Sequence, residues 1–179
     1  SQSEIEQNIS DIVKMKSVAK LSGEEFSKGE KDLVSQVDEY FAEFEYSVEN
    51  SILGDVDITA RGAKDSIAHG IGRNKAVAFA AVPNVIKNGK IIDYQTNWKN
   101  RGYDTVVLAA PVTINDQPYY EGVIVIRDSK TQRFYVHEVI TEKRTDMSFE
   151  TGADNKVGKS GDTSSPSIIS LLDKIRVVK

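Results

Sequence analysis

The sequence lacks cysteine altogether, and its 179 residues include only two histidines, four prolines and one tryptophan. The absence of cysteine excludes disulfides, cysteine nucleophiles and zinc sites built on thiolates. Two histidines are too few for a zinc site with several histidine ligands. Any catalysis must therefore come from histidine, lysine, arginine, carboxylate or hydroxyl side chains.

Long apolar runs are also missing. No segment approaches the ~18 consecutive apolar residues of a membrane span, so no transmembrane helix is predicted. The first residues, 1–4, are polar and acidic and do not resemble a signal peptide. We expect a chain that acts in the cytoplasm, with delivery or secretion as part of a larger protein left open.

Several catalytic motifs are absent as well. The sequence contains no Walker A loop, no dinucleotide-binding glycine pattern after a strand and no G-x-S-x-G elbow. Paired acids at glycosidase spacing do not stand out. No acidic cluster suited to Mg²⁺ occurs in the basic half of the chain. What remains is general acid–base chemistry on a phosphodiester without metal or cofactor, or no chemistry at all.

The net charge of -4 hides an asymmetry along the chain. Residues 1–60 carry 14 Asp and Glu against 5 Lys and no Arg, whereas residues 61–101 carry 8 Lys and Arg against 2 Asp. A local basic region in an acidic protein fits a surface that binds a polyanion. Solvated helix faces and loop charges explain the same pattern.

The first half of the chain is predicted to be helical. Residues 3–49 show the apolar spacing of two amphipathic helices, with a capping box at Ser3 and Glu6. The second helix, from about Ser27, carries an apolar stripe that extends to Val48. Farther along, a short strand at 56–59, a helical turn at 64–69 and a helix from about Asn74 are predicted. Pro83 must kink or restart that last helix.

From Lys90 onward the apolar period changes from about 3.6 to two. Strands are predicted at 90–94, 103–110, 112–114, 119–127 and 133–141, with turns at 115–116 and 128–130. The fold class is therefore α+β: N-terminal helices, an antiparallel sheet of about four to five strands, and a C-terminal helix. The predicted divisions are a helical extension at 1–52, an α+β domain at 53–145, a linker at 146–165 and a helix at 166–179.

His69 is the first candidate for chemistry. It stands at the end of a helical turn, between Lys64 and two glycines, with Arg73 and Lys75 close behind. A histidine near neutral pKa can take a proton from a ribose 2′-hydroxyl, and the two cations can hold a phosphate. A histidine that interacts with the last carbonyls of a helical turn would give the same spacing.

His137 is the second candidate. Strand alternation predicts Arg133, Tyr135, His137 and Val139 on one face of the sheet. Such a polar patch could meet His69. An ordinary half-exposed strand histidine fits equally well.

The third cluster runs from Asn97 to Thr105 and combines aromatic and basic side chains. Trp98 and Tyr103 could stack bases, and Lys99 could bind phosphate. Arg101 could stabilise the charge that builds up on phosphorus. A loop that enters a strand, with its tryptophan over a core edge, is the competing interpretation.

Six short sequence blocks, taken in order, resemble a known family. They are D-S-I-A-H-G, K-A-V-A-F-A-A-V-P-N-V-I-K-N-G, N-W-K, R-G-Y-D-T, A-A-P-V-T and F-Y-V-H-E-V, from about Leu53 to Ile140. The stretch resembles a domain associated with large polyvalent proteins of phages and mobile elements. The same kind of domain occurs at the C-termini of bacterial toxins, including those of contact-dependent inhibition. It is similar to the barnase–EndoU–colicin–RelE group of small RNases.

The resemblance implies a curved antiparallel sheet with a substrate groove on its face, and RNA cleavage without metal. The 2′-hydroxyl would attack the adjacent phosphorus and leave a 2′,3′-cyclic phosphate. His69 would be general base or acid, and His137 its partner. Arg101 and Thr105 would position or stabilise the phosphate. The remaining substrate contacts would be Lys75, Arg73, Lys99, Trp98, Tyr103 and Tyr135.

The function expected from this resemblance is a toxin-like endoribonuclease, with tRNA one candidate substrate. Such a toxin requires a cognate immunity protein as a partner. Two alternatives stay open at this point. One is a non-catalytic binding module of a phage or mobile-element protein, and the other is an effector of the ADP-ribosyltransferase type.

Overall fold

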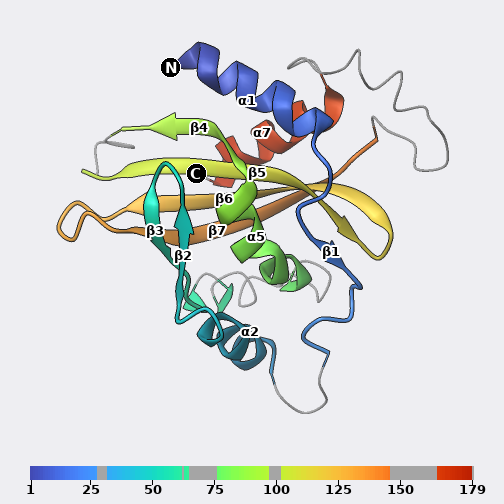
Figure 1. Ribbon diagram of the computed structural model, residues 1–179, viewed down its shortest axis with the longest axis vertical. Coiled ribbons are helices and arrows are strands. Elements are labelled where there is room, and N and C mark those ends of the chain that lie inside the picture. Colours follow the sequence, from blue (N-terminus) through green and yellow to red (C-terminus); the bar gives the residue numbers. More distant parts are fainter. Residues whose placement is uncertain (28–31, 62, 65–75, 97–101, 146–164, 179) are drawn as a thin grey trace.

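The structure, a computed structural model, describes residues 1–27, 32–61, 63–64, 76–96, 102–145 and 165–178. These residues form a seven-stranded mixed sheet with the order β1-β5-β6-β7-β3-β2, and β4 also pairs with β5 (Figure 1). The elements are α1 (Gln2–Lys14), β1 (Lys20–Leu21), α2 (Leu33–Ala42), β2 (Ser47–Asn50), β3 (Gly54–Asp57), the 3₁₀ helix η1 (Ala78–Ala81), α5 (Val82–Asn88), β4 (Lys90–Gln95), β5 (Asp104–Ile114), β6 (Gln117–Arg127), β7 (Phe134–Lys143) and α7 (Pro166–Val178). The predicted α+β class, with helices at both ends of the chain and a curved sheet between them, is confirmed.

The centre of the sheet is the predicted antiparallel meander, β4 to β7. The turn between β5 and β6 consists of Asn115 and Asp116, whose φ angles of 51° and 60° are typical of a tight hairpin turn. The carboxylate of Asp128 accepts hydrogen bonds from the backbone N–H groups of Lys130 (2.7 Å) and Thr131 (3.0 Å) in the next turn. Both turns stand where the sequence predicted them.

A predicted break between two strands at Pro111 is wrong. β5 runs without interruption from Asp104 to Ile114, and Pro111 lies opposite Tyr120 of β6. The carbonyl of Pro111 accepts a hydrogen bond of 2.9 Å from Val18 on the other edge of β5. In a β-strand, the backbone nitrogen and the carbonyl of one residue point to the same edge of the strand. The missing N–H of Pro111 therefore faces the gap between β4 and β1, where no ladder bond is lost.

Helices cover both faces of the sheet, and each face has its own apolar core (Figure 1). On one face α2, η1 and α5 pack through fully buried Val37, Phe41 and Phe79. On the other face α1 and α7 pack through Ile12 and Leu171. The C-terminal helix, predicted at 166–179, therefore docks on the sheet.

The predicted alternation along β7 fails at one residue. Val125 of β6 pairs with Val136, but the preceding residue, Ile124, pairs with Glu138. His137 is therefore the extra residue of a β-bulge. Beyond it the side chains change face, because Val136 and Val139 belong to the core under α2 while Ile140 belongs to the core under α7. The predicted common face of Arg133, Tyr135, His137 and Val139 is wrong for this reason.

The N-terminal part is less helical than predicted. Ser1, and not Ser3, caps α1, because its hydroxyl accepts a hydrogen bond of 3.3 Å from the backbone N–H of Glu4. α2 ends at Ala42, and Val48 lies in β2 instead of on the helix. Two consecutive residues with positive φ, Glu45 at 55° and Tyr46 at 59°, turn the chain between the two elements.

Two short strands also tie residues 1–52 into the sheet. β1 pairs in parallel with β5, and β2 pairs with β3, which in turn pairs in parallel with β7. α5 begins at Val82 with Pro83 in its first turn, which confirms the predicted restart, and Gly89 ends it. Residues 146–164 of the predicted linker lie outside the described residues, and the domain boundaries stay predictions.

Within the ranges that the structure describes, no helix is long and apolar enough to cross a membrane.

Candidate functional site

Three strands align predicted and buried side chains in one row across the sheet. Thr105 of β5 pairs with Ile126 of β6, and Ile126 pairs with Tyr135 of β7. Directly paired residues point to the same face, so the three side chains lie together, with the backbones of Thr105 and Tyr135 about 10 Å apart. They lie on the face that α7 covers farther along the strands. We call this row and the residues around Tyr135 the Tyr135 face.

The hydroxyl of Thr105 is fully buried and has no hydrogen-bond partner in the structure. A buried hydroxyl without a partner costs about 1–3 kcal/mol. The resemblance implied that Thr105 contacts a phosphate, and that role stays a prediction.

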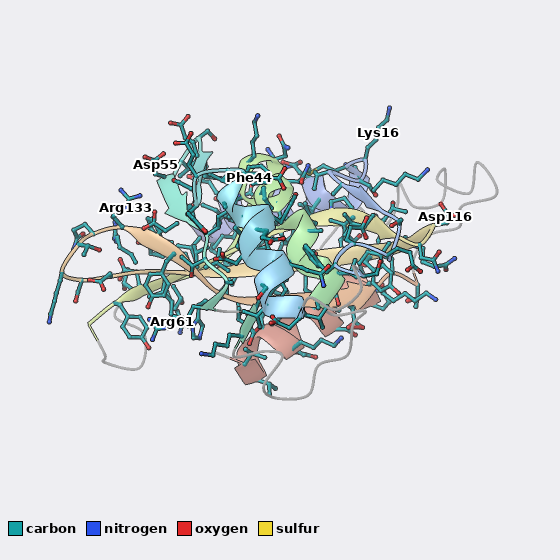
Figure 2. The ribbon with its side chains drawn as sticks, turned by 90° about the horizontal axis from the view of Figure 1, so that it is seen from below. Lys16, Phe44, Asp55, Arg61, Asp116 and Arg133 are labelled. Carbon is teal, nitrogen blue, oxygen red and sulfur yellow. The ribbon has the colours of Figure 1, made fainter. Side chains whose placement is uncertain are left out.

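Three further residues lie near Tyr135: Asp128, Tyr103 and Arg61. Partial burial raises the pKa of the Tyr135 phenol, Asp128 and Tyr103 raise the pKa further, and the guanidinium of Arg61 lowers it. Tyr103 stands two residues before Thr105 and is half-buried, whereas Arg61 is exposed. Figure 2 labels Arg61 and Arg133 at the same end of the molecule, and Arg133 directly precedes β7.

His137 lies in β7, two residues beyond Tyr135, and is exposed. His137 has no partner in β6, because the consecutive residues Val125 and Ile124 pair with Val136 and Glu138. Bulges commonly re-aim a side chain next to a functional site. His137 is therefore accessible from solvent, and regular strand geometry does not fix its direction.

The strand-end arginines do not join this site. Arg133 is held by Asp57, with its Nε 2.8 Å from Oδ2, so it does not form the predicted patch with His137. On the opposite face, the guanidinium of Arg127 bonds to Asp104 and lies 5.3 Å from the centre of the Phe134 ring. Both arginines link neighbouring strands.

Six of the predicted site residues lie outside the described residues, and their roles stay predictions. They are His69, Arg73, Lys75, Trp98, Lys99 and Arg101. Of the predicted site, the structure brings together Thr105, Tyr103 and Tyr135, with His137 beside them. The sequence analysis missed Arg61, because a single arginine after a short strand has no distinguishing spacing.

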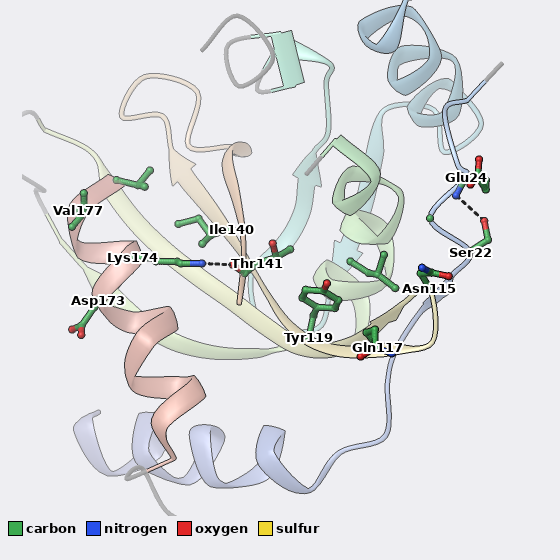
Figure 3. A pocket seen from close by; sticks show the side chains of 13 residues that line it. Ser22, Glu24, Asn115, Gln117, Tyr119, Ile140, Thr141, Asp173, Lys174 and Val177 are labelled. Atoms are coloured by element: carbon green, nitrogen blue, oxygen red, sulfur yellow. Dashed lines mark hydrogen bonds between the residues drawn. The ribbon is translucent and has the colours of Figure 1, made fainter. Parts of the chain in front are cut away.

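A groove lies farther along the sheet, toward the β5–β6 hairpin (Figure 3). Its volume is about 810 Å³, and it lies between the hairpin turn at Asn115, the edge of β7 at Thr141 and the C-terminal half of α7. The side chain of Lys174 lines the groove and donates a 3.0 Å hydrogen bond to the carbonyl of Thr141. Ile140, which lines the groove, pairs with Gly122, four residues from the Ile126 partner of Tyr135, so the near side of the groove is about 14 Å from the Tyr135 face. None of the predicted site residues that the structure describes lines the groove.

No group of three or more His, Asp or Glu side chains that could hold a metal ion occurs among the residues with described positions.

Comparison with known proteins gives one match. No curated protein matches the chain, and no solved structure matches it. The family described as large polyvalent protein-associated domain 3 matches residues 28–135, more than half of the chain. This match contains α2, the β2–β3 hairpin and the meander up to Tyr135, and it ends before His137. Residues 28–52, expected to lie outside the resemblance, are inside it. The chain belongs to the large polyvalent protein-associated domain 3 family.

Proposed function

We propose that the domain is a metal-independent endoribonuclease with its site on the Tyr135 face. The observation that carries the proposal is the meeting of three parts of the chain around Tyr135. Arg61 precedes the segment that contains His69, Tyr103 follows the segment that contains Arg101, and His137 stands two residues beyond Tyr135. All three parts belong to the basic region or to the strand that was predicted to meet it.

The proposed reaction needs one base, one acid and a stabilised phosphate. The base takes the proton of the ribose 2′-hydroxyl, whose oxygen attacks the adjacent phosphorus. The acid protonates the departing 5′-oxygen, so the products are a 2′,3′-cyclic phosphate and a 5′-hydroxyl. In our proposal His69 and His137 share these proton transfers, and Arg101 and Thr105 contact the phosphate.

The test is RNA cleavage by the full chain in excess EDTA, with tRNA and a mixed-sequence RNA as substrates. We expect cyclic phosphate ends, and a loss of at least about 100-fold in rate for His69→Ala and for His137→Ala. Lys130→Ala, in an exposed turn, is the matched control and should keep full activity. Intact RNA at stoichiometric protein would contradict the proposal.

A nuclease of this kind would act in the cytoplasm of the cell that it enters, and the producing cell would need a cognate immunity protein. We propose an immunity protein with an acidic blocking surface, since the basic region of residues 61–101 would have to be covered. Co-expression with such a protein should relieve growth arrest caused by the active chain and leave the His69→Ala variant unaffected.

One observation favours a second candidate, a non-catalytic binding module. The description of the matching family names an association with large polyvalent proteins and no reaction. RNA binding without cleavage in the same assay would support this candidate. NAD consumption would instead indicate the ADP-ribosyltransferase-type effector.

A further inference from the structure

Among the residues that the structure describes, Arg61 has no ion-pair or hydrogen-bond partner, and in this it differs from the other described arginines. The others are held by protein groups: Arg127 by Asp104, Arg133 by Asp57, Arg144 by the carbonyl of Val13 and the Tyr120 ring, and Arg176 by Asp173. Arg61 is exposed, and its five N–H donors are available to an anion. An unpaired guanidinium suits a phosphate, which it can bind with two parallel hydrogen bonds.

The fold brings Arg61 to a defined surface. β3 ends at Asp57, which pairs with Tyr135, and Arg61 follows four residues later. The backbone N–H of Lys64 bonds to the carbonyl of Ala60 at 2.8 Å, so a helical turn begins at this point. Ile58 and Ala60, buried in the core under α2, fix the start of this turn, and the guanidinium of Arg61 is close enough to Tyr135 for its charge to act on the phenol.

Tyr103 and Tyr135 are half-buried, and the charges of Arg61 and Asp128 both act on the Tyr135 phenol. The side chain of Tyr135 stands on a sheet face, in the row with Thr105 and Ile126. Tyrosines on a sheet face provide flat surfaces on which unpaired bases stack, and a neighbouring arginine then holds the backbone. Bases within a duplex are stacked on each other and do not offer their faces.

We infer that Arg61 anchors the phosphate backbone of single-stranded RNA whose bases stack on Tyr103 and Tyr135. The inference rests on the proposed function for the identity of the polymer, and it adds a binding residue and the strandedness of the substrate. Arg61 acts in binding and takes no proton from the ribose.

The experiment measures binding separately from cleavage. The probe is a fluorescein-labelled, mixed-sequence 15-nucleotide RNA with 2′-O-methyl groups throughout, which has no 2′-hydroxyl to attack, and a duplex of the same sequence. Anisotropy titrations at several salt concentrations give the affinity and the salt slope. Arg61→Ala is compared with Arg176→Ala, an exposed arginine on α7 that is already paired with Asp173. Thermal unfolding confirms that both variants are folded.

We expect Arg61→Ala to weaken binding of the single strand about 5- to 10-fold and to reduce the salt slope by about 0.7, the value for one phosphate contact on a single strand. Arg61→Lys should restore most of the slope, and Tyr135→Ala should weaken binding more than Tyr135→Phe. Arg176→Ala should match the unchanged chain.

Equal affinities of Arg61→Ala and Arg176→Ala would overturn the inference. Absence of binding to the single strand, or binding to the duplex that is as tight, would also overturn it. If Arg61 proves necessary for binding but natural RNA stays intact, the nuclease proposal fails and the role of Arg61 stands. If RNA is cleaved and Arg61→Ala binds normally, only the role of Arg61 fails.

Discussion

Glu121 is fully buried in the middle of β6, and neither of its carboxylate oxygens has a hydrogen-bond partner in the structure. Burial raises its pKa well above the ordinary value of 4.5. The carboxylate also raises the pKa of Tyr40, after burial of Tyr40 itself and after the charges of Glu43 and Glu25. Glu121 therefore folds as a neutral acid beneath α2.

This residue makes stability depend on pH. Because the folded state binds the proton of Glu121 more tightly than the unfolded state, its favourable contribution is complete below about pH 4.5 and is lost as the pH rises through the folded pKa. We expect the free energy of unfolding to fall between about pH 5 and about pH 8. Glu121→Gln, which is always neutral, should remove this decline.

Urea unfolding at the two pH values measures the effect, and Glu49→Gln, an exposed glutamate in β2, is the control. The same pH dependence in Glu121→Gln and in the unchanged chain would contradict the assignment.

Thr105 allows binding and stability to be separated. Its buried hydroxyl has no partner, so Thr105→Val keeps the shape and removes an unsatisfied polar group. We expect the free energy of unfolding to rise by about 1 kcal/mol, or to stay unchanged. RNA cleavage should fall if the hydroxyl contacts phosphate. A loss of stability on chemical denaturation would show instead that the hydroxyl has a structural partner.

At the scale of the elements, the bulge in β7 makes one deletion tolerable. Removing His137 leaves Val136 opposite Val125 and Glu138 opposite Ile124, with every later side chain on its present face. We expect this deletion to preserve the fold at a cost of about 1–2 kcal/mol, while cleavage is lost. Deleting Val123, where the β6 ladder is regular, shifts the residues beyond it to the opposite face and should abolish folding. Circular dichroism and thermal unfolding distinguish the two cases, and equal damage would contradict the bulge.

Gly89 connects α5 to β4 through a very close contact. A Cβ atom at this position would lie 2.5 Å from the carbonyl oxygen of Val85 and 2.9 Å from that of Ala109. Both are backbone atoms and cannot rotate away, so Gly89→Ala should cost more than about 2 kcal/mol. Gly122→Ala is the control, since its Cβ would meet side chains only at 3.7 Å. Denaturant midpoints compare the two, and equal midpoints would show that the α5–β4 connection adjusts.

For the whole molecule, the family match is smaller than the folding unit. Residues 28–135 lack α1, β1, most of β7 and α7, which supply Ile12, Leu171 and Ile175 to the core on one face. Losing a single large buried side chain costs about 2–5 kcal/mol, and total stability is about 5–15 kcal/mol. We expect the 28–135 fragment to show no cooperative unfolding by circular dichroism, in contrast to the full chain. A sharp transition in the fragment would contradict this prediction.

Much of this architecture was predictable from local patterns. The period of two from Lys90 onward, the Asn115–Asp116 turn and the spacing of Ile168, Leu171 and Ile175 identified the meander and the docked helix. β1, with two residues, was too short for any period to appear. The bulge at His137 was also invisible, because only the partner strand defines it.

The candidate site was predictable to a smaller extent. Residue chemistry identified Thr105, Tyr103, Tyr135 and His137, but the proximity of Arg61 to Tyr135 depends on the parallel pairing of β3 with β7. The two residues are 74 positions apart in the sequence, and no local pattern predicts that they lie near each other.

The unbroken paired length of β5 and β6, 11 residues each, also separates the two ends of the domain. Thr141 beside the groove and Tyr135 near the far end are five residue pairs apart along the β6–β7 ladder, about 17 Å. Two different molecules can therefore occupy one copy of this domain at once without touching. A compound bound in the groove would leave the far end open to its own ligand.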